Sequence, residues 1–476
     1  MAIAFKQYWT MCGIILNLIT IGYHLGYTTI LLRDLKAPGS DIKLSLEAES
    51  WVVSAIAISS LLSGLMVAPT LQILGRKSAH ISVVLPNLIA CLILYFAQNI
   101  TALVIARLAS GFTFGTTIFV AAIIIGEYSS PEYRGVFLNA KSASYSLGVF
   151  LVHCVGIFYD WRMTALIGLI PSVLSLINTL TWSESPAWLA YKGRYEACEA
   201  SFQQLRGDSY RAKEELLLLM ETQRNRRLSK IKGKSKISSF RQNLSKLGKK
   251  DFIRPSLIVL FVFVILESSG RHSFSAYAVR FMSAFTTNNT STLYYVLAVD
   301  GVVCICGILS CVIVKLYRRR TIIFTSGGLA CVLLVSICVY LYLKAKGIAP
   351  EDSIWLPLTL LFTYHVVINL GVAPIIMALL GEVYPLEHKG FGAVVSGVFF
   401  SVSVLVALKV TPALIKSMEV YGTFLVYSLC LAGSLVYLYI FLPETEGKTL
   451  QEIEHHFNGV PLTLQNDTEE KLLNSK

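Results

Sequence analysis

The sequence has little charge for its length and lacks the common motifs of a soluble enzyme. Only 15% of its 476 residues are charged, whereas 54% are hydrophobic, and soluble domains usually carry about 25% charged residues. We find no P-loop, no nucleophile elbow and no zinc-binding helix motif. These absences argue against an enzyme, and the composition points to a protein whose helices lie in lipid.

Cysteines are few and do not form a metal-binding pattern. Most of the ten cysteines lie inside apolar runs, where a thiol behaves as a small hydrophobic group. Cys304 and Cys306 have no second ligand pair elsewhere in the chain. We therefore expect no metal and no cofactor.

Positive charge is concentrated in one segment. The formal net charge is +12, and residues 183–250 hold sixteen Lys or Arg against seven Asp or Glu. Positive charge spread over a soluble surface would indicate nucleic acid binding. A single basic loop between apolar stretches is instead typical of the cytoplasmic side of a membrane protein. We expect membrane lipid around the chain and no nucleic acid partner.

Twelve apolar stretches are long enough to cross a bilayer as helices, which takes about 20 residues. They predict an all-α membrane protein, because so many spans leave little chain for anything else. The first stretch lacks the small-residue cleavage site of a signal peptide, so we interpret it as a retained helix. The predicted spans are residues 9–32, 51–72, 79–98, 101–125, 136–158, 162–182, 252–283, 292–315, 321–343, 353–380, 391–413 and 421–442.

The short basic loops fall on one side of a twelve-span topology. They contain Arg76, Arg134, Arg319 and Lys389. Under the positive-inside rule this side is cytoplasmic. We therefore expect both termini in the cytosol and the chain in the plasma membrane.

Sequons occur on the opposite side, and the loop before the eighth span holds two that overlap. Asn288 and Asn289 both begin the pattern Asn-x-Ser/Thr. This pattern is the acceptor for glycosylation on surface loops. We predict that one of these asparagines is glycosylated.

The two halves of the chain repeat the same charged positions. Arg76 and Arg319 are 243 residues apart, and Glu184 and Glu444 are 260 apart. A parallel repeat of six spans predicts two six-helix bundles with a binding site between them near the membrane midplane. The expected domains are a first bundle, a basic cytosolic loop with short helices, a second bundle and a cytosolic tail, at residues 1–182, 183–250, 251–442 and 443–476.

Acids as well as bases recur at these helix ends. Loop signals for membrane topology would account for the bases alone, so we favour a cytoplasmic gate whose charges pair in one conformation and separate in another. The predicted gate residues are Arg76, Arg107, Glu127, Arg134, Glu184, Arg319, Glu382, Lys389 and Glu444.

Five motifs occur in an ordered set along almost the whole chain. They are Gly75-Arg76-Lys77, Arg107 with Gly111, Glu127 to Gly135, Glu184-Ser185-Pro186 and Pro443-Glu444-Thr445. This set resembles the sugar porter family of the major facilitator superfamily, and within it the insect facilitated trehalose and glucose carriers.

The resemblance implies a carrier that moves a small polar solute, a sugar or a polyol, by alternating access. It also implies short cytosolic helices in the 183–250 loop. Residues 195–206 and 211–227 have helical composition, and residues 229–250 read as a basic, serine-rich linker.

The family's sugar contacts are only partly retained. By resemblance, Ser142 stands where the family has a glutamine and Met377 where it has a tryptophan, whereas Tyr277 matches. Residues 266–272 replace an amide-rich family motif. Such a cavity has lost several hydroxyl partners and can suit a charged or less hydroxylated solute.

Ionisable residues in spans are costly and usually mark a pathway. Glu267 and Arg271 are four apart, so on one helix they would share a face and could pair. They are either a self-neutralised structural pair or the replacement contact for the solute. The predicted solute-binding residues are His24, Ser142, Glu267, Arg271, His272, Tyr277 and Met377.

His24 stands where proton-coupled relatives carry an acid. A membrane histidine is either a hydrogen-bonded packing residue or a proton carrier. Without an acid at this position we expect uniport. Two alternatives stay open, namely a proton-coupled symporter that uses His24 or Glu267, and a sensor that kept the fold without transport.

Overall fold

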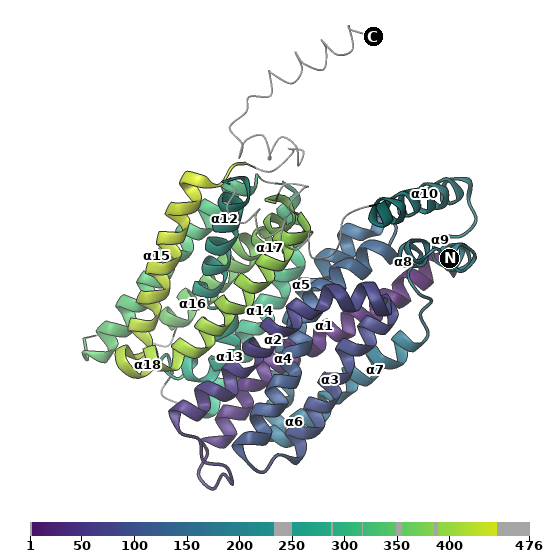
Figure 1. The fold of residues 1–476 in the computed structure, drawn as a ribbon. Coiled ribbons are helices and arrows are strands. Elements are labelled where there is room, and N and C mark those ends of the chain that lie inside the picture. Colours follow the sequence, from purple (N-terminus) through teal and green to yellow (C-terminus); the bar gives the residue numbers. More distant parts are fainter. Residues whose placement is uncertain are drawn as a thin grey trace. The chain divides into compact units, whose positions relative to one another are not determined.

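The computed structural model describes residues 2–232, 250–286, 289–316, 318–348, 355–384 and 389–444. Within these ranges all regular structure is helical (Figure 1), which confirms the all-α prediction. The helices are α1 (Ala2–Leu35), α2 (Leu46–Leu74), α3 (Arg76–Phe96), α4 (Ile100–Tyr128), α5 (Pro131–Phe158), α6 (Trp161–Ile167), α7 (Leu169–Leu180), α8 (Pro186–Lys192), α9 (Tyr195–Arg206), α10 (Tyr210–Lys232), α12 (Lys250–Ser268), α13 (Arg271–Met282), α14 (Asn289–Leu316), α15 (Arg319–Ala345), α16 (Trp355–Val367), η1 (Ile368–Val372), α17 (Ala373–Glu382) and α18 (Lys389–Phe441).

Eleven stretches of the described chain are long and apolar enough to cross a membrane. The last stretch, Gly392–Phe441, has 50 residues, whereas one crossing takes about 20. Glu419 has φ 58° and ψ −174° and breaks α18 into two helices at this point. With this break the described residues contain twelve apolar helical stretches, in agreement with the twelve predicted spans.

Two spans of the second half are interrupted near their middle. The seventh span is divided between α12 and α13 by a turn at Gly270, whose φ is 74°. The tenth span contains the π-helical segment η1 between α16 and α17. Such π-helical turns leave backbone groups out of the regular ladder and are frequent at functional sites.

The chain divides into two compact units. Unit 1 comprises Met1–Lys234, His272–Ile308 and Val404–Ser417, and unit 2 comprises Ser235–Arg271, Leu309–Ser403 and Met418–Lys476. The predicted domains follow the sequence repeat instead, and their boundaries stay a prediction.

In unit 1, α1 packs against α5 and α7, and both α2 and α3 pack against α4. The backbones of α1 and α5 approach each other closely because a glycine lies where the two helices cross. A Cβ atom on Gly148 of α5 would lie 2.0 Å from the carbonyl oxygen of Ile19. Small residues at helix crossings let backbones approach in this way inside membranes.

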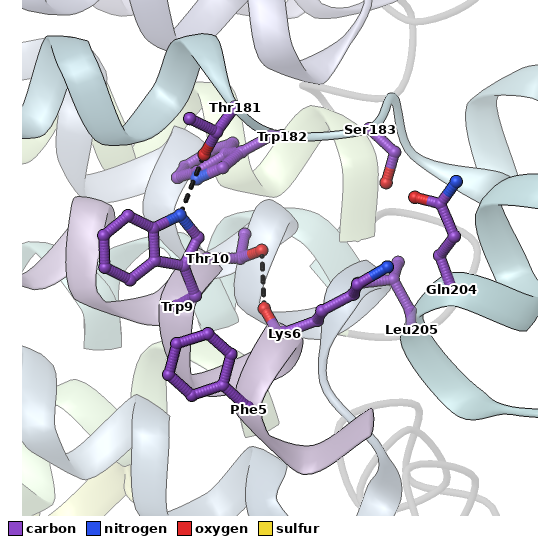
Figure 2. Close-up of a pocket in the computed structure, with 9 residues that line it drawn as sticks. All are labelled: Phe5, Lys6, Trp9, Thr10, Thr181, Trp182, Ser183, Gln204 and Leu205. Carbon is purple, nitrogen blue, oxygen red and sulfur yellow. Dashed lines mark hydrogen bonds between the residues drawn. The ribbon is translucent and has the colours of Figure 1, made fainter. Parts of the chain in front are cut away.

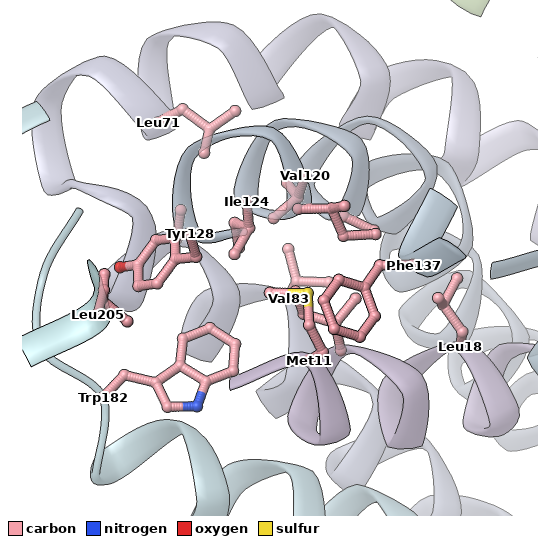
Figure 3. Close-up of a cluster of buried hydrophobic side chains, with 14 residues drawn as sticks. Met11, Leu18, Leu71, Val83, Val120, Ile124, Tyr128, Phe137, Trp182 and Leu205 are labelled. Carbon is pink, nitrogen blue, oxygen red and sulfur yellow. The ribbon is translucent and has the colours of Figure 1, made fainter. Parts of the chain in front are cut away.

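A buried apolar cluster connects the spans of unit 1 to the helices that follow them (Figure 3). It includes Met11 of α1, Tyr128 of α4, Phe137 of α5 and Leu205 of α9, together with the indole of Trp182. Because α9 contributes a side chain to this cluster, the start of the 183–250 loop is anchored to the helices of the membrane region.

Helices α8, α9 and α10 pack on one another at the end of unit 1 where α1 begins (Figure 1). They confirm the predicted helices at 195–206 and 211–227. Helix α10 continues to Lys232, so the first part of the predicted linker is helical, and residues 233–249 lie outside the described chain.

Burial among α8, α9 and α10 raises the pKa of the Cys198 thiol to about 11, so this thiol stays protonated at neutral pH.

Unit 2 is built around α15, which packs against α16 and η1, while α12 packs against α17. The Tyr364 hydroxyl donates to the carbonyl oxygen of Ser269 at 2.9 Å, beside the break in the seventh span. The Tyr384 hydroxyl donates to Ser256 Oγ at 3.2 Å. The first bond holds α16 to the break in the seventh span, and the second holds α12 to the end of the tenth span.

Candidate functional site

Three side chains of the first half form a charged group that we call the Arg76 cluster, made of Arg76, Glu127 and Glu184. Two nitrogens of Arg76 bond the Glu127 carboxylate, Nε at 2.7 Å and Nη2 at 2.5 Å. Both side chains are less than 20% exposed. A bidentate ion pair that is largely shielded from solvent is among the stronger side-chain contacts in proteins.

Glu184 caps the start of α3. Its Oε1 accepts from the backbone nitrogens of Arg76 at 2.7 Å and Lys77 at 3.3 Å. The first backbone N–H groups of a helix have no partner inside the helix and favour a negative charge. The acid at the end of the sixth span thus makes a specific contact with the turn before α3.

The second half makes the same contact. Glu444 follows the twelfth span, and its Oε2 accepts from the backbone nitrogen of Arg320 at the start of α15, at 3.3 Å. The repeat that is visible in the sequence is therefore also a repeat of one interaction, in which an acid after the last span of a half caps the start of the third span of that half.

The other predicted gate residues lie at several places. Arg107 is twenty residues before Glu127 on α4, which is about 30 Å along a helix, so it is not part of the Arg76 cluster. Arg319 lies in the first turn of α15. Arg134, Glu382 and Lys389 lie at helix ends, and their side chains are outside the description. The bonds among Arg76, Glu127 and Glu184 all stay within the first half, so pairing between halves stays a prediction.

Arg107 and His24 meet deep inside unit 1. Arg107 is fully buried and donates to the His24 carbonyl oxygen at 2.8 Å and to the hydroxyl of Thr28. His24 Nε2 lies 3.3 Å from the Cys91 sulfur. Within the described chain no carboxylate bonds Arg107, and its Nε has no partner. A guanidinium held by neutral oxygens in this way is a costly feature.

A second buried contact joins α5 to α14. His153 Nδ1 lies 2.5 Å from Asp300 Oδ2, and His153 Nε2 lies 3.2 Å from the Gly26 carbonyl oxygen of α1. Sequence reasoning missed Asp300, although it is an acid in the middle of the eighth span. The rule that ionisable residues in spans are functional would have found it.

The end of unit 1 opposite the Arg76 cluster has its own ion pairs. Glu49, whose side chain is 3% exposed, lies 2.8 Å from Lys36 Nζ and 3.2 Å from Arg280 Nη1. We call these three residues the Glu49 network. They border a cavity of about 420 Å³ lined by α1, α2, α13 and α14. The network joins helices of the first sequence half to α13 of the second, and sequence reasoning missed it because the partners are far apart in the chain.

Further contacts support this end. Thr29 Oγ1 donates to the Ser275 carbonyl oxygen at 2.9 Å and accepts from the Ala278 nitrogen at 3.2 Å. The Lys409 ammonium lies 3.6 Å from the centre of the Trp51 ring. In unit 1, α1 and α2 are therefore held to α13 and α18 by several polar contacts.

The predicted solute-binding residues are only partly brought together. In unit 1 the His272 ring packs edge-on against Phe114, with ring centres 5.8 Å apart. The centre of the same ring lies 6.3 Å from the centre of the Tyr145 ring. The Tyr277 hydroxyl donates to the Leu408 carbonyl oxygen at 2.9 Å. Ser142 is half-buried on α5.

Glu267 and Arg271 lie on either side of a helix break, so the expectation that they share one helix face is wrong. Gly270, with φ 74°, ends α12 before α13 begins at Arg271. The spacing of four residues therefore does not carry the helical geometry on which the expectation depended. Glu267 is buried in unit 2.

Three of the predicted residues cannot be described at the side-chain level. Met377 lies on α17 and Asn289 begins α14, and the side chains of both are outside the description. Asn288 lies outside the described residues altogether. Their roles stay predictions.

The turn before α3 predicts a sharp effect of one substitution. Gly75 has φ 92° and ψ −178°, and a Cβ there would lie 2.3 Å from Glu184 Oε2. This backbone region is essentially restricted to glycine and costs other residues about 1–3 kcal/mol. Gly75→Ala should therefore lower the thermal unfolding midpoint of the purified protein in detergent. Gly64→Ala is the control, because a Cβ at Gly64 meets nothing within 4 Å. Equal midpoints for both variants would contradict the assigned role of the turn.

Similarity to known sugar carriers extends along nearly the whole chain. A family model described as "Sugar (and other) transporter" matches residues 9–457. The facilitated trehalose transporter Tret1 of Apis mellifera ligustica is 26% identical over 445 residues, with 93% of this chain and 86% of that protein covered. Tret1 of Drosophila willistoni is also 26% identical, and this chain spans half of its length.

Solved structures show the same fold. An inward-open conformation of the xylose transporter XylE from E. coli superposes with a TM-score of 0.76 at 16% identity and covers 94% of this chain and 99% of that one. A major facilitator superfamily proton:xylose symporter structure gives 0.74 at 18% identity, with 96% and 100% covered. At this identity the likeness shows the fold alone. The family match shows more, since it extends along nearly the whole sequence. The chain belongs to the sugar transporter family, whose members are membrane carriers and not enzymes, and it has the major facilitator fold.

Proposed function

We propose that the chain is a facilitated carrier that moves trehalose, a hexose or a related polyol down its concentration gradient. The match of the sugar transporter family along residues 9–457 carries this proposal. The relatives from Apis and Drosophila, which are named facilitated trehalose transporters, favour trehalose among the possible solutes.

The buried polar groups of unit 1 support uniport over proton coupling. Arg107 bonds the His24 backbone and Thr28, and no described carboxylate bonds it. A proton-coupled mechanism needs a group in the pathway that gains and loses a proton during the cycle. Here the position of that acid is taken by His24, which lies against the thiol of Cys91.

The solute-binding residues are proposed from their place in the spans. In unit 1 these are His24, Ser142, His272 and Tyr277. Phe114 and Tyr145 beside His272 offer the flat apolar surfaces on which a sugar ring can pack. The polar side chains would supply the hydroxyl partners.

Alternating access gives the Glu49 network a role. For a solute to enter at that end, α1 and α2 must separate from α13, and the bonds of Glu49 to Lys36 and Arg280 must break. The network therefore favours the conformation in which this end is closed. Its counterpart is the Arg76 cluster, which we assign to the cytoplasmic gate.

The orientation and location are also proposed. The basic 183–250 loop favours a cytosolic position for this loop and for both termini, in the plasma membrane. Asn288 or Asn289 would then face the outside and carry a glycan.

An uptake experiment tests the transport proposal. The full chain is reconstituted into liposomes with an imposed inward proton gradient, and uptake of labelled trehalose, glucose, fructose and a polyol is measured with and without a protonophore. We expect saturable uptake of at least one of them, trans-stimulation by internal unlabelled solute, and no effect of the protonophore. Background uptake of every solute would overturn the sugar proposal, and loss of accumulation with the protonophore would overturn uniport.

A single substitution tests the Glu49 network. A cysteine at Val279, which lines the cavity beside the network, reports access by a membrane-impermeant thiol reagent. Hydrogen bonds to charged groups contribute about 1.5–3 kcal/mol, so Glu49→Gln should speed labelling by about tenfold or more. Glu47→Gln, an exposed acid two residues earlier, is the matched control and should leave the rate unchanged. If both variants label like the parent, the network does not hold this end closed.

A further inference from the structure

A second cavity, of about 670 Å³, opens in unit 1 where α1 begins and α7 ends. Figure 2 shows its lining, which comes from α1, from the link after α7 and from α9. None of these side chains belongs to the Arg76 cluster, to the Glu49 network or to the proposed solute site. The lining residues are Phe5, Lys6, Trp9, Thr10, Thr181, Trp182, Ser183, Gln204 and Leu205.

The cavity lies at the level of a membrane surface. The first apolar stretch begins at Phe5, and the sixth ends at Leu180. The lining residues from α1 and from 181–183 are therefore at the boundary of two spans, whereas α9 follows outside them. Aromatic side chains at such a boundary sit at the level of lipid headgroups.

One side of the cavity is an apolar wall whose rings are fixed. Phe5 and Trp9 stack with ring centres 6.1 Å apart and are 63% and 42% exposed. Trp9 Nε1 donates to Thr181 Oγ1 at 2.8 Å, and Trp182 Nε1 donates to Asn178 Oδ1 at 2.8 Å. Because both indole nitrogens are bonded, the rings present apolar surface to an occupant, as an acyl chain requires.

The other side carries three polar groups without side-chain partners. In the described chain the Lys6 ammonium, the Ser183 hydroxyl and the Gln204 amide make no side-chain hydrogen bond or ion pair. Figure 2 shows the Lys6 side chain extended toward Leu205 and Gln204, on the same side as the Ser183 hydroxyl. An ammonium, a hydroxyl and an amide are donors that a phosphate oxygen accepts from.

We propose that this cavity binds one anionic phospholipid of the leaflet on the side of the Arg76 cluster. Its acyl chain covers Phe5 and Trp9, and its phosphate lies among Lys6, Ser183 and Gln204. The charge of Lys6 gives a preference for a headgroup with net negative charge. The bound lipid fills the space between α1 and α9, beside the bond from Gln7 Nε2 to the Leu205 carbonyl oxygen. This inference does not depend on which solute the carrier moves.

Native mass spectrometry of the full chain in detergent tests the proposal with phosphatidylserine as the probe. A lysine near a membrane surface contributes about 1 kcal/mol to anionic lipid binding, so Lys6→Gln should weaken the first binding step about fivefold. Phe5→Ala should weaken it as well, since it removes part of the apolar wall. Lys43→Gln, an exposed lysine beyond the opposite end of α1, is the matched control and should bind like the parent.

Two further probes test whether the site prefers an anionic lipid over a neutral one and over free phosphate. Phosphatidylcholine should bind more weakly than phosphatidylserine, and inorganic phosphate alone should neither bind nor raise the thermal unfolding midpoint. The proposal is overturned if Lys6→Gln binds phosphatidylserine like the parent, if phosphatidylcholine binds equally well, or if inorganic phosphate alone occupies the site. A circular dichroism melt of each variant confirms that it is folded.

Discussion

A carboxylate shielded from water needs a partner for its charge, and this constraint determines which helices of unit 1 stay together. Glu127 is held by Arg76 within the first half. Asp300 is held by His153 between α5 and α14, and Glu49 is held by Lys36 and Arg280. Of these three carboxylates, Asp300 and Glu49 join the sequence halves. The removal of one partner from such a shielded pair is costly. Within unit 1, Glu127 therefore holds α4 to α3, whereas Asp300 and Glu49 hold helices of the first sequence half to α14 and α13.

The carboxylates that cap two helix starts explain why the repeat is visible in the sequence at all. Glu184 and Glu444 each accept from the backbone at the start of the third span of their half. A backbone N–H group is present whatever the residue, so the acid alone must be retained at the right place. The positions that we propose to line the solute site, Ser142 and Met377 among them, have no such backbone constraint, so they are free to vary while the scaffold is kept.

Local patterns in the sequence predicted local structure well and distant contacts poorly. Hydropathy predicted the twelve spans, and composition predicted helices at residues 195–206 and 211–227, because both depend on neighbouring residues. The prediction that Glu267 and Arg271 share a helix face was wrong because the helix ends at Gly270, whose φ is 74°. Hydropathy does not indicate this helix end, since the apolar stretch continues past it. Glu49 and Arg280 are far apart in the chain, and Asp300 pairs with a histidine of the other half, so neither pairing has a sequence signature. Arg107 was recognised in the sequence as part of a motif, but the groups that its guanidinium contacts could be identified only from the structure.

The central claim is that the carrier must open at the Glu49 network in every transport cycle. The most direct measurement is sugar uptake by the Lys36→Cys/Arg280→Cys variant before and after treatment with a reducible bifunctional thiol reagent. The account predicts that cross-linking abolishes uptake, that reduction restores it, and that either single cysteine is insensitive. Full uptake by a completely cross-linked protein would show that this end does not need to open, and would contradict the account.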